Sequence, residues 1–66
     1  MQVIVNGEPR EVPDGATVAS IVESVTRAPS GVAVALNGEV VRRADWPTTP
    51  AHDADRLEVL TAVQGG

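Results

Sequence analysis

Hydrophobic and polar residues alternate near both ends of the chain and follow a helical spacing between them. Residues 1–6 and 56–63 alternate with period two, as in strands that have one buried face. Four apolar residues with helical spacing lie in the first half: Val18, Ile21, Val22 and Val25. This spacing predicts one apolar stripe on a helix of about three turns, which begins after Thr17 and ends before Ala28 and Pro29.

Three shorter segments predict further strands, over residues 9–12, 32–36 and 39–41. Asn6 and Gly7 separate the first two predicted strands, and Asn37 and Gly38 separate a later pair. Asn-Gly is a pair that two-residue hairpin turns favour. Residues 42–50 contain a tryptophan and two prolines, which predicts an irregular or short 3₁₀ crossover before the last strand.

The first turn of the helix is expected to have only one of the two hydrogen bonds of a capping box, the one to the Thr17 hydroxyl. Thr17 has the hydroxyl that an N-cap residue uses. Ser20 occupies the third helical position, where a capping box has Glu or Gln. The capping box is therefore expected to be incomplete.

This order of elements predicts a two-layer α+β domain. One helix with a single apolar stripe covers one face of a mixed sheet of four to five strands. A right-handed crossover through the helix is expected to place the third strand beside the first hairpin. The long connection before residue 56 lets the last strand run parallel to the first, in the centre of the sheet. This is the ubiquitin-like β-grasp arrangement, predicted for residues 1–63 with a tail of residues 64–66.

The alternation also assigns side chains to the two faces of the sheet. The helix is expected to cover Val3, Val5, Val34, Leu36, Leu57 and Val59. The opposite face is expected to carry an apolar patch made of Ile4, Ala33, Ala35, Leu60 and Ala62. Because these strands lead to the tail, we expect this face to dock partner proteins, with Glu58 and Glu39 at its rim to meet basic residues.

Composition narrows the possible functions. The 66 residues make one domain, too short to enclose an enzyme's walled cleft. Cysteine is absent, which excludes disulfides and a cysteine metal site. The net charge of −4 argues against nucleic acid and for a basic partner surface. No apolar run reaches membrane-spanning length and no basic-then-apolar leader opens the chain, so we expect a cytoplasmic protein without membrane contact.

The side chains offer little catalytic chemistry. His52 lies beside Asp53 and Asp55, which is more typical of solvated turn residues than of a metal site. The serines have no second histidine to form a nucleophile pair, so serine chemistry is not expected. Trp46 is expected to form a partly buried lid over the crossover. We therefore expect neither a catalytic residue nor a metal site.

The sequence ends on Gln64, Gly65 and Gly66, directly after the last predicted strand. Two glycines carry no side chains, so this end offers an α-carboxylate on a thin stem that fits a narrow active site. A lone pair of glycines also fits an ordinary frayed end. The rest of the chain has to decide between these two interpretations.

Three segments together resemble the sulfur carrier proteins of the ThiS family of thiamine biosynthesis. They are residues 1–8, residues 34–41 with Arg43 and Trp46 after them, and residues 55–66. The similarity covers essentially the whole chain. Ala54 departs from the family, which usually has Gly there; if this turn needs a positive φ, Ala costs roughly 1 kcal/mol.

The resemblance implies a carrier protein and not an enzyme. In the family, an E1-like, ThiF-type adenylyltransferase uses ATP and Mg²⁺ to adenylate the terminal glycine carboxylate, here that of Gly66. Sulfur from a persulfide donor then displaces AMP, and a ThiG-type thiazole synthase consumes the resulting thiocarboxylate. The chain itself is expected to bind no cofactor. Without cysteine it cannot hold sulfur as its own persulfide, which agrees with Gly66 as the carrying group.

Two alternatives remain open. The small subunit of molybdopterin synthase is a related sulfur carrier, although such chains are usually longer. A ubiquitin-like modifier would instead be joined through Gly66 to lysines of target proteins. The chain has no lysine of its own, which excludes chains of the modifier but not single conjugation.

Overall fold

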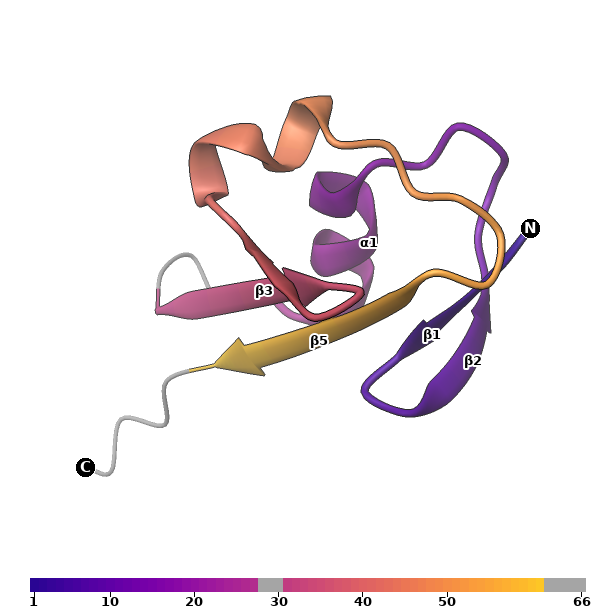
Figure 1. The fold of residues 1–66 in the computed structure, drawn as a ribbon, viewed down its shortest axis with the longest axis horizontal. Helices are drawn as coiled ribbons and strands as arrows, with labels where there is room; N and C mark the ends of the chain where they lie inside the picture. The colour runs from indigo at the N-terminus through magenta and orange to yellow at the C-terminus, as the bar shows by residue number, and fades with distance from the viewer. Residues whose placement is uncertain (28–30, 62–66) are drawn as a thin grey trace.

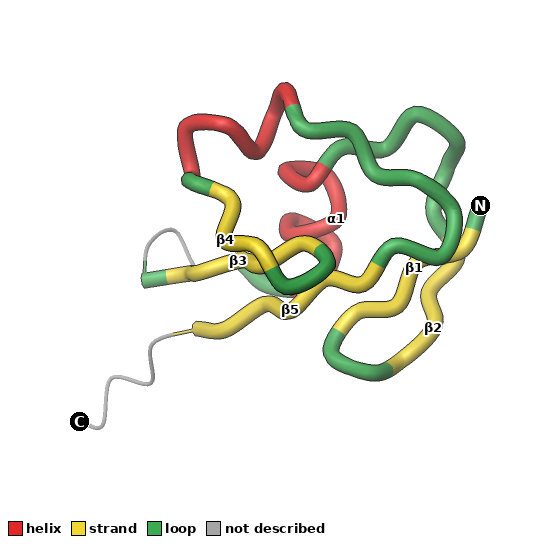
Figure 2. Tube along the Cα trace, viewed as in Figure 1, coloured by secondary structure: helices red, strands yellow, loops and turns green. Residues whose placement is uncertain are grey.

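The computed structural model describes residues 1–27 and 31–61, and the predicted order of elements is confirmed (Figure 1). The elements in chain order are β1 (Gln2–Val5), β2 (Glu8–Glu11), α1 (Val18–Val25), β3 (Val32–Leu36), β4 (Glu39–Val41), the 3₁₀ helix η1 (Arg43–Thr48) and β5 (Arg56–Thr61). The crossover that the sequence predicted as irregular or 3₁₀ is η1 followed by a loop (Figure 2). Residues 62 and 63, which were predicted to continue the last strand, lie outside the described residues.

The helix is shorter than predicted. It has 8 residues and ends at Val25, because Thr26 already adopts an extended backbone with φ −143°. The amide of Thr26 still donates to the carbonyl of Val22, at 2.9 Å, which closes the last turn. Thr is β-branched and a weak helix former, so the chain leaves the helix before it reaches Pro29.

The five strands form one mixed sheet in the order β2-β1-β5-β3-β4. β5 runs parallel to β1 and antiparallel to β3, so the predicted central position of the last strand is confirmed. The expectation that β3 lies directly beside the first hairpin is wrong, because β5 occupies the place between β1 and β3. The two hairpins therefore contact each other through β5, which joins them into one sheet.

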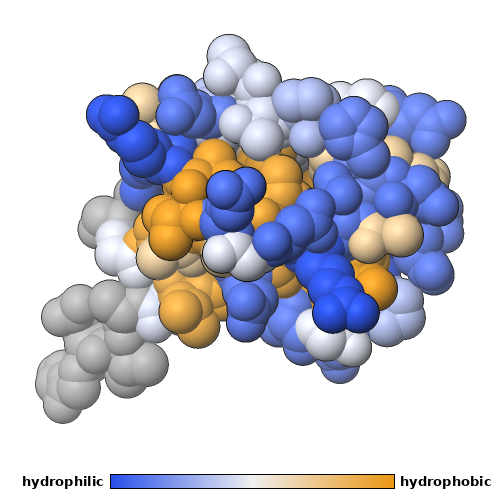
Figure 3. All heavy atoms as spheres, in the orientation of Figure 1, coloured by the Kyte–Doolittle hydropathy of each residue, from blue (hydrophilic) through white to orange (hydrophobic). Residues whose placement is uncertain are grey.

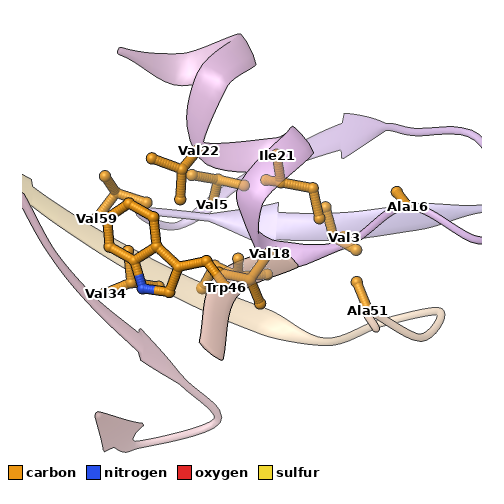
Figure 4. Close-up of a cluster of buried hydrophobic side chains, with 11 residues drawn as sticks. Val3, Val5, Ala16, Val18, Ile21, Val22, Val34, Trp46, Ala51 and Val59 are labelled. Carbon is orange, nitrogen blue, oxygen red and sulfur yellow. The ribbon is translucent and has the colours of Figure 1, made fainter. Parts of the chain in front are cut away.

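The hydrophobic core lies between α1 and one face of the sheet (Figure 4). It consists of Val3, Val5, Ala16, Val18, Ile21, Val22, Val34, Trp46, Ala51, Leu57 and Val59. The predicted face assignment is thus confirmed, with Leu36 only partly buried against the same cluster. No buried side-chain nitrogen or oxygen of the described residues lacks a hydrogen-bond partner.

The capping box of α1 is complete, in contrast to the expectation. Ser20 donates its amide to Oγ1 of Thr17, at 3.2 Å, and the amide of Thr17 donates to Oγ of Ser20, at 3.0 Å. The serine hydroxyl also donates to the carbonyl of Thr17, at 2.9 Å, which orients its oxygen toward the amide. A short hydroxyl can therefore replace the longer Glu or Gln side chain of the usual capping box.

Trp46 belongs to the core and is not the partly buried lid that the sequence predicted. Its side chain lies in η1 and the residue is only 7% exposed. The indole nitrogen donates to the carbonyl of Val41, at 2.9 Å, and so ties η1 to the end of β4. The Arg43 guanidinium lies 5.3 Å from the centre of the ring, on the solvent side of this packing.

Candidate functional site

The tail that the sequence singled out, Gln64, Gly65 and Gly66, lies outside the described residues, as does Ala62. What the structure defines is the strand from which the tail continues. β5 is held on both edges, and its five residues Leu57 to Thr61 pair with residues of β3. On the other edge the amide of Ile4 donates to the carbonyl of Asp55, at 2.8 Å, and that of Asn6 to Leu57, at 2.9 Å. The described residues before the tail therefore belong to a central strand, which pairs with β1 as far as Leu57 and with β3 as far as Thr61.

Two side-chain amides add to this frame, and the sequence indicated only their turns. Asn6 donates from Nδ2 to the carbonyl of Val59, at 3.1 Å, and its Oδ1 accepts from the amide of Val59, at 2.8 Å. Asn37 accepts from the amide of Arg56, at 3.0 Å, and donates to the carboxylate of Asp55, at 3.1 Å. Both asparagines have φ 51°, as hairpin turns of this kind require. Both Asn-Gly turns were predicted, but not that each asparagine side chain bonds to the central strand or to the residue before it.

Part of the predicted docking face comes together as expected. Ala33 lies opposite Leu60, which is 68% exposed, and Ala35 lies opposite Glu58. In Figure 3 hydrophobic atoms gather over β3, β4 and the end of β5, with hydrophilic residues around them. We name Ala33, Ala35, Val40 and Leu60 the open-face patch.

Val40 was missed by the sequence reasoning, although it is 79% exposed. It pairs with Ala35 and therefore shares the face of that residue. The register of the hairpin around Asn37 and Gly38 would have placed it there. Glu39 pairs with Leu36 on the helix-covered side, so the expectation that it borders the open-face patch is wrong.

Ile4 lies on the open face, as expected, but apart from the open-face patch. It is half-buried on β1 and lies opposite Arg56, at the beginning of β5. β1 pairs with β5 only as far as Leu57, so Leu60 lies beyond the end of β1. Ile4 instead lines a shallow hollow of about 920 Å³ that crosses β5 between the two hairpin turns. The other residues of that hollow are Asn6, Gly7, Asn37, Gly38, Arg56, Leu57 and Glu58, with no histidine or nucleophile among them.

The residues around His52 serve the turn before β5, but Asp55 is less solvated than expected. Its Oδ2 accepts from the amide of His52, at 2.8 Å, and its side chain is 15% exposed. Burial raises the pKa of the Asp55 carboxyl, but hydrogen bonds from Asn37 and His52 outweigh it and leave the pKa below its usual value. Asp53 accepts from the amide of Gln2, at 2.9 Å, and so ties the turn to β1.

The described residues form neither a metal-binding cluster nor a membrane-spanning helix. Within residues 1–27 and 31–61, no three His, Asp or Glu side chains gather where they could hold a metal ion. In the same part of the chain, no helix has the length and apolar character needed to cross a membrane. Ser20 caps α1 and Ser24 donates to the carbonyl of Ile21, at 2.7 Å, so both hydroxyls have structural partners.

Comparison with known proteins agrees with this fold and its tail. A model of the ThiS family matches residues 3–66. The Thermus thermophilus sulfur carrier protein ThiS is 39% identical over 64 residues, which is 97% of this chain and 98% of that protein. The crystal structure of the thiamine biosynthesis protein ThiS from Geobacter metallireducens superimposes with a TM-score of 0.81 at 33% identity, covering 100% of both chains.

A third relative is a longer protein. The thiazole synthase of Magnetococcus marinus is 32% identical over 66 residues, which is 100% of this chain but only 20% of that protein. The match to the family model extends over nearly all of the present sequence, and the mixed five-stranded sheet with its helix is similar in fold to the solved relative. This chain belongs to the ThiS family.

Proposed function

We propose that this protein carries sulfur for the thiazole branch of thiamine biosynthesis, bound as a thiocarboxylate at the carboxyl end of Gly66. The observation that carries the proposal is the ThiS family match, which runs through the two glycines at residues 65 and 66. This match favours the thiazole pathway over a molybdopterin-synthase subunit or a protein modifier. We propose a cytoplasmic location, since the first step consumes ATP.

The chemistry needs an activated carboxylate. A carboxylate is a poor electrophile, so an adenylyltransferase of the ThiF type joins it to AMP from Mg-ATP and releases pyrophosphate. The terminal sulfur of a persulfide donor then attacks the acyl carbon, and AMP leaves. A second thiol cleaves the resulting acyl disulfide, which frees the thiocarboxylate. ATP and Mg²⁺ are bound by the partner enzyme in this scheme.

The described part of the chain supports a carrier role, because it holds the strand before the tail in the centre of the sheet. β5 is the central strand, so the described residues that precede the tail are held within the sheet. The hollow between the two hairpin turns has no histidine, serine or threonine among its lining residues. Gly65 and Gly66 have no Cβ, so they fit a channel too narrow for larger residues. The catalytic groups are thus supplied by the partners.

The open-face patch is proposed as the docking surface for these partners. Its four residues lie on β3, β4 and β5, and Leu60 lies next to the strand end from which the tail continues. Arg56 and Glu58 lie on the same face of β5 as Leu60, because every second side chain of a strand points the same way. They add charged groups beside the patch. The Magnetococcus relative supports a thiazole synthase as one partner, because a segment similar to this chain is part of that protein.

The proposal is tested by sulfur transfer to the purified protein. Incubation with a ThiF-type enzyme, Mg-ATP and a persulfide donor should raise the intact mass by the difference between sulfur and oxygen, localised to Gly66. Deletion of Gly66, or Gly65→Trp, should abolish the mass increase and leave the melting temperature unchanged, because the core cluster of the described residues is already formed between Val3 and Val59. Normal sulfuration of the protein that lacks Gly66 would contradict the proposal.

A further inference from the structure

The side chain of Asn6 forms the backbone hydrogen bonds with β5 that one further residue of β1 would form. β1 ends at Val5, and Asn6 turns away with φ 51°. Its side chain nevertheless forms a donor and an acceptor hydrogen bond with the backbone of Val59, at 3.1 and 2.8 Å. A strand residue uses its own amide and carbonyl in the same way. The side-chain amide therefore extends the pairing along this edge of β5 by one step.

Val59 is the last described position at which the β1 side holds β5. Along this edge the hydrogen bonds from the β1 side reach Asp55 first, then Leu57 and then Val59. Backbone groups alternate along a strand, so those of Thr61 point to the same side. The first hairpin has already turned back at that point, and the described partner of Thr61 is Val32 of β3. Asn6 thus marks where β5 passes from two neighbouring strands to one.

We propose that Asn6 is a positioning residue for the tail, an inference that rests on the sulfur-carrier function proposed above. By fixing the backbone of Val59, it sets the position and direction of β5 at Thr61, the last described residue before the tail. Adenylation requires the carboxylate of Gly66 to reach the α-phosphate of ATP in a defined geometry. A small displacement at the base of the tail moves the carboxylate and lowers the rate of the chemical step.

Asn37 provides a matched control on the other side of the same strand. It lies in the second Asn-Gly turn, also with φ 51°, and its side chain also forms two hydrogen bonds. Those bonds hold Asp55 and Arg56, at the beginning of β5 and away from the tail. Asn37→Ala therefore removes a similar set of bonds and leaves the contact with Val59 intact.

The experiment compares full-length wild type, Asn6→Ala and Asn37→Ala as substrates of the ThiF-type enzyme with Mg-ATP. We expect Asn6→Ala to lower kcat for pyrophosphate release by about tenfold to 100-fold with little change in KM, because docking is kept and alignment is lost. Asn37→Ala should retain the kcat of wild type. Asn6→Asp keeps an acceptor for the amide of Val59 and should restore part of the rate. Hydrogen exchange of the Val59 amide should be faster in Asn6→Ala than in Asn37→Ala.

Several results would overturn the inference. Equal kcat values for the two alanine variants, or a change in KM alone for Asn6→Ala, would show that Asn6 does not align the tail. If Asn6→Ala does not fold, Asn6→Gly takes its place, because glycine also removes both bonds to Val59 and adopts φ 51° without strain. A wild-type rate together with unchanged exchange at Val59 in that variant would refute the role. If wild type itself releases no pyrophosphate, the sulfur-carrier proposal fails. The exchange rates of the Val59 amide in the unbound variants then decide on Asn6 separately.

Discussion

Val59 and Leu60 are neighbours in sequence but lie on opposite faces of the central strand. Val59 is 6% exposed and packs in the core under α1, whereas Leu60 is 68% exposed on the other face. Consecutive side chains of a strand point to opposite sides, so one residue step separates the core from the proposed docking surface.

We expect Leu60→Arg to fold and to weaken binding to the adenylyltransferase and to thiazole synthase. An exposed substitution changes the free energy of unfolding by about 0.5 kcal/mol or less. Val59→Arg buries an unpaired charge, which costs several kcal/mol, comparable to the roughly 3–5 kcal/mol that so small a core supplies. Thermal melts should therefore show an unfolded Val59→Arg protein and a folded Leu60→Arg protein.

Adenylation rates complete this comparison, with Val40→Arg as a second variant of the open-face patch. Val40 is 79% exposed and lies on the edge strand, so its substitution should also leave the fold intact and raise KM. A folded and fully active Leu60→Arg protein would show that docking occurs elsewhere. An unfolded Leu60→Arg protein beside a folded Val59→Arg protein would contradict the strand register.

Ala54→Gly should stabilise the protein. Ala54 is exposed and has φ 70°, a left-handed conformation that costs an alanine about 1 kcal/mol or more. Its amide donates to the carbonyl of Gln2, at 2.7 Å, which holds it in this conformation. The gain is reduced by the greater freedom of glycine in the unfolded chain, so we expect about 0.5–1 kcal/mol and a melting temperature several degrees higher.

The matched control for Ala54→Gly is Ala44→Gly. Ala44 is also exposed, but it lies in η1 and is not among the residues with positive φ. Glycine there adds only unfolded-state freedom, so the melting temperature should fall. Equal shifts in the two variants would show that the positive φ of Ala54 carries no strain.

Acid should destabilise the protein partly through Asp55. Burial raises the pKa of this carboxyl, but the hydrogen bonds from Asn37 and His52 more than compensate, so the pKa in the folded protein lies below 3.8. A lowered pKa means that the stabilisation is present above pH 3.8 and is lost as the pH falls through the folded value. Urea unfolding of wild type should accordingly show a falling free energy of unfolding in this range.

Asp55→Asn removes the titrating carboxyl and tests how much it contributes to the free energy of unfolding. At neutral pH the variant should be less stable by about 1–3 kcal/mol, because the new NH₂ group faces one of the two donors at Asn37 and His52. The difference from wild type should shrink below pH 3.8, where the carboxyl of wild type becomes protonated. A difference that stays constant over the whole pH range would contradict this role of Asp55.

The fold could be predicted because its signals are local. The spacing of Val18, Ile21 and Val22 predicts the helix, and the Asn-Gly pairs predict both hairpins, since each pattern depends on residues close in sequence. What was missed depends on contacts between distant segments. Neither the hydrogen bonds of Asn6 to Val59 nor the burial of Trp46 can be inferred without knowing which strand lies beside which.

The docking face shows the same limit. Alternation correctly assigned Ile4, Ala33, Ala35 and Leu60 to the open side, because period two is a property of each strand alone. Grouping Ile4 with them required the stagger between β1 and β5, and including Val40 required the register between β3 and β4. The stagger is set by pairing between distant segments, whereas the Asn37-Gly38 turn sets the register of β3 and β4 and could have placed Val40.

The central place of β5 also has a consequence for how the chain folds. Before residues 56–61 arrive, the two hairpins share no ladder of backbone hydrogen bonds, because β5 alone lies between them. The sheet is therefore completed by joining segments from opposite ends of the sequence, a slow type of contact to form for a chain of this size. The open-face patch, the proposed docking surface, has residues from both β3 and β5, and these come together only once that has happened. A partner that binds them selects chains that have finished folding.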